Sequence, residues 1–87
     1  MPKFTYPIVF IFNETEEWYH GYLPDLGLYT NGAQLEDVYG DAEETLKDYF
    51  KILTQEGFEV PQATSLEDIS KKWKGYKVSL MTANLPD

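Results

Sequence analysis

The chain has 87 residues and a mass of 10.1 kDa, and 43% of its residues are hydrophobic and 16% aromatic. This length predicts one small domain, and this composition excludes a disordered or fibrous chain. Fifteen acidic residues against seven lysines give a formal charge of −8, which argues against nucleic-acid binding by the overall field of the protein.

Cysteine is absent and there is one histidine. The sequence therefore excludes disulfides and thiolate metal sites, gives no basis for a structural zinc site, and fits a reducing compartment. No apolar run approaches the roughly 18 residues that span a membrane, and acidic residues follow the short apolar start where a signal peptide would be cleaved. We expect a cytoplasmic protein with no membrane segment and no cofactor.

The first part of the chain predicts three strands. Tyr6–Phe12 is apolar at every position, which is typical of a strand covered on both faces or central in an oligomer. A turn at Asn13–Glu16 joins it to Trp18–Leu23, so the two strands form a hairpin. Pro24–Gly27 breaks the second strand, and Leu28–Thr30 is a brief third strand that ends at an Asn-Gly pair.

The hydrophobic period then changes to that of a helix of about five turns. Its apolar stripe consists of Leu35, Val38, Ala42, Thr45, Leu46, Tyr49, Phe50 and Leu53. Gly57 is the expected C-cap. Gly40 lies inside the helix, where glycine costs about 1 kcal/mol relative to alanine, and we interpret it as a point of close approach to the sheet.

After the helix, Val60–Thr64 predicts a loop. Ser65, with Asp68 at the third position, predicts an N-cap for a short helical segment up to about Lys71. Tyr76–Ala83 predicts the last strand. The order β-β-β-α-β indicates an α+β domain with a mostly antiparallel sheet and one long helix on one face. We expect the last strand to lie beside the first.

No residue pattern points to catalysis. The first two strands carry no carboxylate, so the converging acids of a two-metal hydrolase are missing. His20 lies between Tyr19 and Gly21 in a strand, which is more typical of a packed residue than of a catalyst. The chain has neither a glycine-flanked nucleophile nor a phosphate-binding glycine pattern. We predict that the protein is not an enzyme. Binding of Mg²⁺ or Mn²⁺ in calorimetry would instead indicate a residual metal hydrolase.

Three features could bind a protein partner. Trp18, His20 and Tyr22 share one side of the second strand. One side of this strand packs under the helix, and the other is a solvated aromatic surface or an interface; Trp18 and Tyr22 are candidate contacts. Asp25 is a third candidate contact, although a Pro-Asp-Leu-Gly segment also suits turn chemistry. Opposite the apolar stripe, the helix carries an acidic stripe, which is either a solvated face or a surface that steers a basic partner. The acidic stripe consists of Asp37, Asp41, Glu44 and Asp48.

A basic cluster near the end of the chain surrounds Trp73. Its members are Lys71, Lys72, Lys74 and Lys77. Aromatic rings among lysines can stack on single-stranded nucleic acid. Because the whole chain carries a charge of −8, we interpret the cluster as a solvated loop.

Several short motifs, in order, resemble the HicB-like antitoxin domain. They are Tyr6-Pro7-Ile8-Val9, Leu23-Pro24-Asp25-Leu26-Gly27, Thr30-Asn31-Gly32, the helical segments 34–38 and 42–46, and Val60-Pro61. The resemblance covers about residues 6–62, and the last strand also fits. The chain departs from the family pattern in two places. The Pro-Gly-Cys that follows the Asp-Leu is reduced to Gly27-Leu28-Tyr29, and an early Glu-Ala in the helix is Asp37-Val38.

The resemblance implies a degenerate ribonuclease-H-like fold without catalytic acids. In HicA–HicB systems such domains bind and block a small, basic, mRNA-cleaving toxin, so it implies an antitoxin role. Residues 1–87 are interpreted as one HicB-like domain. The C-terminal DNA-binding module of longer relatives is not expected, and neither is direct DNA binding. The alternative is a stand-alone domain of structural or regulatory role with no toxin. The family also implies a homo-oligomer, a dimer or a tetramer.

Overall fold

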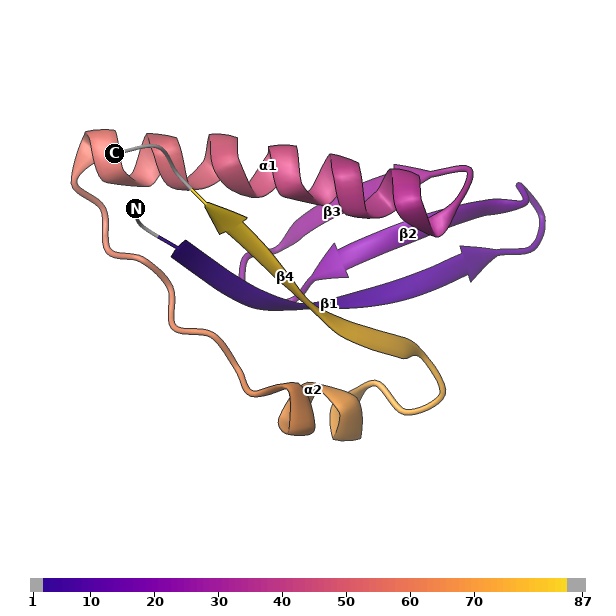
Figure 1. The fold of residues 1–87 in the computed structure, drawn as a ribbon. Helices are drawn as coiled ribbons and strands as arrows, with labels where there is room; N and C mark the ends of the chain where they lie inside the picture. The colour runs from indigo at the N-terminus through magenta and orange to yellow at the C-terminus, as the bar shows by residue number, and fades with distance from the viewer. Residues whose placement is uncertain (1–2, 85–87) are drawn as a thin grey trace.

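A computed structural model describes residues 3–84 of the chain. The elements, in order, are β1 (Lys3–Asn13), β2 (Trp18–Leu23), β3 (Leu28–Gly32), α1 (Leu35–Glu56), α2 (Leu66–Lys72) and β4 (Lys77–Asn84). Figure 1 shows α1 lying along one face of the sheet and the short α2 below the other. We call these the inner and the outer face. The predicted α+β architecture is confirmed.

The four strands form one sheet in the order β3-β2-β1-β4, with every neighbouring pair antiparallel. The last strand therefore lies beside the first, as predicted. β2 has its predicted bounds, whereas β1 begins three residues earlier than predicted because β4 pairs with it as far as Lys3 and Asn84. Pro7 is tolerated in the central strand because the pairing with β2 begins only at Val9.

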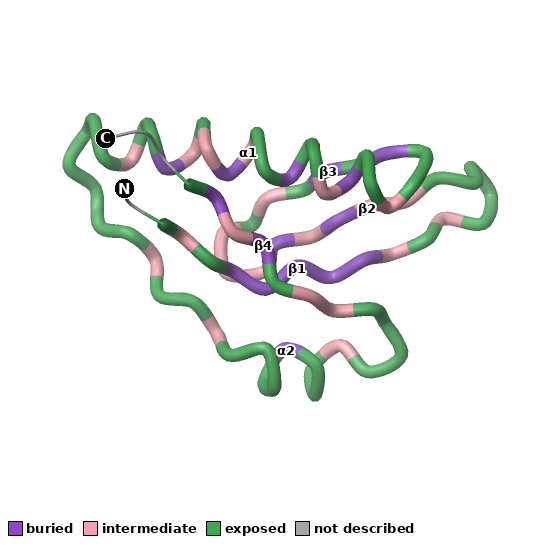
Figure 2. Tube along the Cα trace, viewed as in Figure 1, coloured by how far each residue is buried: buried purple, intermediate pink, exposed green. Residues whose placement is uncertain are grey.

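The main core lies between the inner face and α1. Tyr6, Ile8 and Phe10 alternate along β1 and face the buried stripe of the helix. That stripe consists of Val38, Ala42, Leu46 and Phe50, all fully buried. Figure 2 shows the burial concentrated on the sheet-facing side of α1 and along the middle of β1. Complete burial of a large apolar side chain contributes about 1.5–3 kcal/mol, so this layer holds the domain together.

Both predicted helix caps are confirmed. Gly57 adopts a left-handed conformation with φ of 72°, and its backbone N–H donates to Leu53 at the end of α1. The Ser65 hydroxyl accepts a hydrogen bond from the Asp68 N–H at the start of α2.

The close approach of helix and sheet takes place at Gly21 and Gly32, and the prediction for Gly40 is wrong. A Cβ atom at Gly21 would lie 2.7 Å from both Thr30 Oγ1 and Val38 Cγ1, and one at Gly32 would lie 3.0 Å from the Val38 nitrogen. A Cβ atom at Gly40 would meet nothing within 4 Å, because this part of the helix surface faces away from the sheet. Glycine is therefore required at position 21 of β2, where Val38 and Thr30 leave no room for a side chain.

The outer face is covered only in part. Ile69 of α2 is buried, as are Pro7 and Val9, the residues of β1 that point away from α1. The apolar run of β1 is thus explained by two covers, a long helix on one face and a short helix on the other.

Two side chains hold the connection between α1 and α2 against the sheet. The Tyr6 hydroxyl donates to the carbonyl oxygen of Pro61. The Asp25 carboxylate accepts from the Thr64 N–H at 2.8 Å and from its hydroxyl at 2.6 Å. Burial raises the pKa of the Tyr6 phenol above its ordinary value of 10.0, and the charge of Asp25 raises it further.

We expect this raised pKa to appear in the alkaline stability of the protein. The folded state holds the Tyr6 proton more tightly than the unfolded state, so its contribution is complete below pH 10 and declines as the pH rises through the raised pKa. Tyr6→Phe should lower the free energy of unfolding by about 1 kcal/mol at pH 7 and flatten its decline above pH 10. Urea denaturation at a series of pH values measures the free energy of unfolding of both proteins. If the two free energies declined in parallel above pH 10, Tyr6 would not be the group responsible.

The two glycines give a matched pair of stability predictions. Gly21→Ala should lower the free energy of unfolding by about 1–3 kcal/mol, because the new methyl group overpacks the contact with Thr30 and Val38. Gly40→Ala should raise it by up to about 1 kcal/mol through helix propensity alone. Urea denaturation at neutral pH measures both changes, and equal effects at the two positions would refute the difference in packing.

Candidate functional site

The outer face carries a line of four aromatic rings across the strands, which we call the aromatic row. Its members, from β3 towards β4, are Tyr29, Tyr22, Trp73 and Tyr76. Tyr29 stacks on Tyr22 with ring centroids 4.6 Å apart. Trp73 packs edge-on against Tyr22 at 5.7 Å and against Tyr76 at 5.8 Å. The ring of Tyr29 is 70% exposed and that of Tyr76 is 48% exposed, so the row is accessible at both ends.

The predicted alternation of the second strand agrees with the structure, which also decides which of its two sides lies beneath α1. Tyr22 pairs with Val9 on the outer face, and Trp18 and His20 lie on the same side by the alternation of β2. Trp18 is 38% exposed. Tyr19 and Leu23 point the other way and belong to the core beneath α1. The candidate contacts Trp18 and Tyr22 are therefore both available from the outer face.

The sequence reasoning missed Tyr29. Its position is set by pairing with Tyr22 across the β2–β3 hairpin. The short Pro24–Gly27 turn and the alternation of the two strands were a usable signal, because they place the two tyrosines opposite each other.

The structure does not bring Asp25 close to Trp18. Trp18 begins β2 and Asp25 lies in the turn beyond its other end. The five residue steps of the strand alone span about 17 Å at 3.3 Å per residue. The Asp25 carboxylate is engaged by Thr64, 39 residues away, rather than by its own turn. Asp25 is partly exposed and is therefore accessible at the margin of the outer face. It also has a structural role, because it holds the connection between α1 and α2 through Thr64.

The acidic stripe of α1 is exposed along its whole length. Two of its four members also bond to backbone. Asp37 accepts from the Gln34 N–H in the capping box, and Asp41 accepts from the Asn31 N–H of β3 at 3.3 Å. Glu44 and Asp48 continue the stripe toward the end of the helix. Negative charge is thus collected on the side of the molecule away from the aromatic row.

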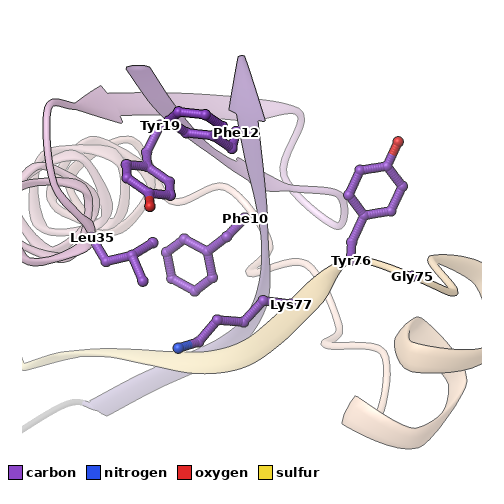
Figure 3. A pocket seen from close by; sticks show the side chains of 7 residues that line it. All are labelled: Phe10, Phe12, Tyr19, Leu35, Gly75, Tyr76 and Lys77. Atoms are coloured by element: carbon purple, nitrogen blue, oxygen red, sulfur yellow. The ribbon is translucent and has the colours of Figure 1, made fainter. Parts of the chain in front are cut away.

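A cavity of about 320 Å³ lies near the start of α1, between the helix and the ends of β1 and β2. In Figure 3, Leu35, Phe10 and Tyr19 face a shared space, whereas Tyr76 extends to the other side of the strand. The lining is mostly apolar, with the Lys77 side chain as its charged group. It brings together no acid and base that could perform catalysis.

Within residues 3–84, no three His, Cys, Asp or Glu side chains gather in a way that could hold a metal ion. Over the same residues, no helix is long and apolar enough to cross a membrane.

Neither a protein-family model nor a curated protein sequence matches the chain. Solved structures do match in fold. The N-terminal domain of the Burkholderia pseudomallei antitoxin HicB aligns with a TM-score of 0.81 and 17% identity, over 94% of this chain and 100% of that domain. A chain of a toxin–antitoxin complex from Streptococcus pneumoniae aligns with a TM-score of 0.80 and 18% identity, over 95% of this chain and 70% of that chain.

Two further structures extend the comparison. A chain of a HicA3 and HicB3 toxin–antitoxin complex aligns with a TM-score of 0.64 and 24% identity, over 97% of this chain and 100% of that chain. In a second structure of the B. pseudomallei antitoxin HicB, the TM-score is 0.77 at 18% identity, and the match covers 90% of this chain but only 61% of the antitoxin. The likeness extends through all the elements of the chain, and the protein has a HicB-like fold.

Proposed function

We propose that the protein is an antitoxin-like binding domain that neutralises a small basic RNA-cleaving toxin of the HicA type by direct contact. The observation that carries this proposal is the fold, because chains of the same fold occur in toxin–antitoxin complexes. The exposed aromatic surface supports it as well, since exposed aromatic side chains are the usual anchors of protein interfaces.

The charge distribution supports a basic partner. The chain carries a formal charge of −8, and the acidic stripe of α1 is exposed. Charges of this kind accelerate the encounter of two proteins and make it sensitive to salt, whereas buried aromatic contacts set the rate of dissociation. We assign steering to the acidic stripe and anchoring to Trp18 and Tyr22, with Asp25 at the margin of the contact.

The proposal predicts that the protein, used as bait in a lysate of its source cell, captures one small basic protein, and less of it at high salt. The captured protein, made separately, should cleave RNA and lose this activity when the bait is added at equal concentration. Trp18→Ala with Tyr22→Ala should weaken the complex about 30-fold or more, as expected for two interface anchors. Titration calorimetry measures this change.

Ile52→Ala with Phe58→Ala is the matched control. These side chains are 58% and 63% exposed but lie at the far end of α1 and beyond it, so affinity should be unchanged. Equal affinity of the Trp18/Tyr22 variant and the wild type would remove the site. A captured protein without RNA-cleaving activity would remove the function.

A homo-oligomeric domain is the second candidate function, and the free edge of β4 favours it. The Asn31 N–H bonds to Asp41 of α1 and therefore points away from β2, so the helix blocks the β3 edge of the sheet at this position. β4 forms the opposite edge. From Ser79 to Asn84 it has no charged residue, proline or glycine, the usual devices that prevent edge strands from pairing.

The register tells which groups of β4 are free. Along each strand, the backbone N–H and C=O groups of successive residues point towards opposite neighbouring strands. Because those of Asn31 point away from β2, the pairing register fixes their direction in β2, then in β1 and finally in β4. It directs the N–H and C=O groups of Val78, Leu80 and Thr82 away from β1. The side chain of Leu80 is 47% exposed. A second copy pairing antiparallel about Leu80 would place the two leucines opposite each other.

This second candidate predicts a dimer in solution that a charge at the centre of the edge disrupts. Light scattering after size exclusion should give about twice the chain mass for the wild type and for the control Ile52→Lys. Leu80→Lys should have the mass of the monomer, because two like charges would face each other across the paired edges. A wild type that remains monomeric at high concentration, or a Leu80→Lys variant that remains dimeric, would contradict pairing through β4.

A further inference from the structure

The segment that joins α2 to β4 has a charge opposite to that of the rest of the molecule. Residues 71–77 contain four lysines and no acid, together with Trp73 and Tyr76. Residues 1–57, in contrast, contain 11 acids and three lysines and account for the whole net charge of −8. We call residues 71–77 the basic segment.

The fold presents the basic segment as a tight turn against the aromatic row. The Tyr76 N–H donates to the Trp73 carbonyl at 3.2 Å, and Gly75 takes a φ of 88°, which favours glycine. This turn keeps the rings of Trp73 and Tyr76 in contact. Trp73 also packs against Tyr22, so two of the four rings of the row come from the basic segment and two from the sheet.

The lysines of the segment are exposed, but they do not all lie on the same side of the sheet. Lys77 pairs with Phe10 and lines the cavity on the inner face, and Lys71 forms an exposed ion pair with Glu67 at 3.3 Å. Lys72 and Lys74, which adjoin Trp73 in the chain, form no ion pair with another described residue. Two cations therefore lie next to a row of rings that is accessible at both ends.

We propose that the basic segment and the aromatic row bind single-stranded nucleic acid without sequence preference. Bases stack on the exposed ring faces of Tyr29 and Tyr76, and phosphates contact Lys72 and Lys74. Stacking tolerates any base because every base has a π-face, and the lysines follow the backbone. This activity does not depend on the proposed toxin binding, although Tyr22 belongs to both surfaces.

The overall negative charge does not oppose this site as strongly as the composition suggests. At physiological ionic strength charges are screened over about 8 Å. The acidic stripe lies on α1, on the other side of the sheet from α2 and the basic segment (Figure 1). The nearer acids are Asp68 and Glu67 of α2, and Glu67 is paired with Lys71. A phosphate at Lys74 therefore meets Lys72 and Lys74 at short range and the acidic stripe only across the sheet.

The test is fluorescence anisotropy of a labelled 12-nucleotide uridine RNA with the whole chain, over a range of salt concentrations. The wild type should bind at low salt, with log affinity falling against log salt by about 0.7 for each phosphate contact. Lys72→Ala with Lys74→Ala should remove two contacts and reduce this slope by about 1.4. Tyr29→Ala should weaken binding about fivefold or more, the loss expected for one stacked base.

Matched controls distinguish loss of the site from a change in net charge and from the loss of an exposed ring elsewhere. Lys47→Ala with Lys51→Ala changes the charge of the chain equally but on α1, and Phe58→Ala removes an exposed ring elsewhere, so both should bind as the wild type does. In a Trp18→Phe background Trp73 is the remaining tryptophan, and RNA should quench its emission.

Three outcomes would overturn the proposal. They are no binding at low salt, equal losses in the two lysine double variants, or displacement of the RNA by polyglutamate as readily as by unlabelled RNA. The last result would mean that the segment attracts any polyanion by charge alone, so that its partner could be an acidic protein. It would also mean that the rings do not stack on bases.

Discussion

Burial of β1 on both faces is the constraint on which the rest of the structure depends. On the inner face, Tyr6, Ile8 and Phe10 are covered by α1, and on the outer face Pro7 and Val9 are covered where α2 packs. A strand of this kind is stable only in the middle of a sheet, between β2 and β4. The extended register of β4 against β1 follows from the same requirement, because the apolar run needs a partner along most of its length.

The second cover depends on polar contacts rather than on packing alone. The connection from α1 to α2 has few buried side chains, and it is held by Tyr6 at Pro61 and by Asp25 at Thr64. These bonds place α2 beside β4, with Trp73 at its end against Tyr22, and leave the rest of β2 and β3 open on the outer face. The position of these hydrogen bonds therefore determines how much of the aromatic surface stays open. Asp25 contributes to this through its bonds to Thr64, which help to position α2.

The molecule separates three kinds of surface. The acidic stripe lies on α1, the aromatic row crosses the outer face, and the uncharged edge of β4 lies at the end of the sheet opposite the capped β3. A basic protein, a single-stranded nucleic acid and a second copy of the chain would each use a different combination of these surfaces. Tyr22 belongs both to the proposed toxin contact and to the aromatic row, so the structure predicts competition between those two partners.

The sequence by itself determined the element types, both helix caps, the alternation of side chains along β2 and the place of β4, because hydrophobic period and turn residues are local signals. Only the tertiary structure decided which glycine lies at the helix–sheet contact. It also decided which residue engages Asp25 and which rings meet around Trp73. Gly21 and Gly40 look alike in sequence, and only the packing of α1 distinguishes them. Likewise, a charge count over the whole chain cannot show that Lys72 and Lys74 lie across the sheet from the acidic stripe of α1, since that separation arises when distant segments pack together.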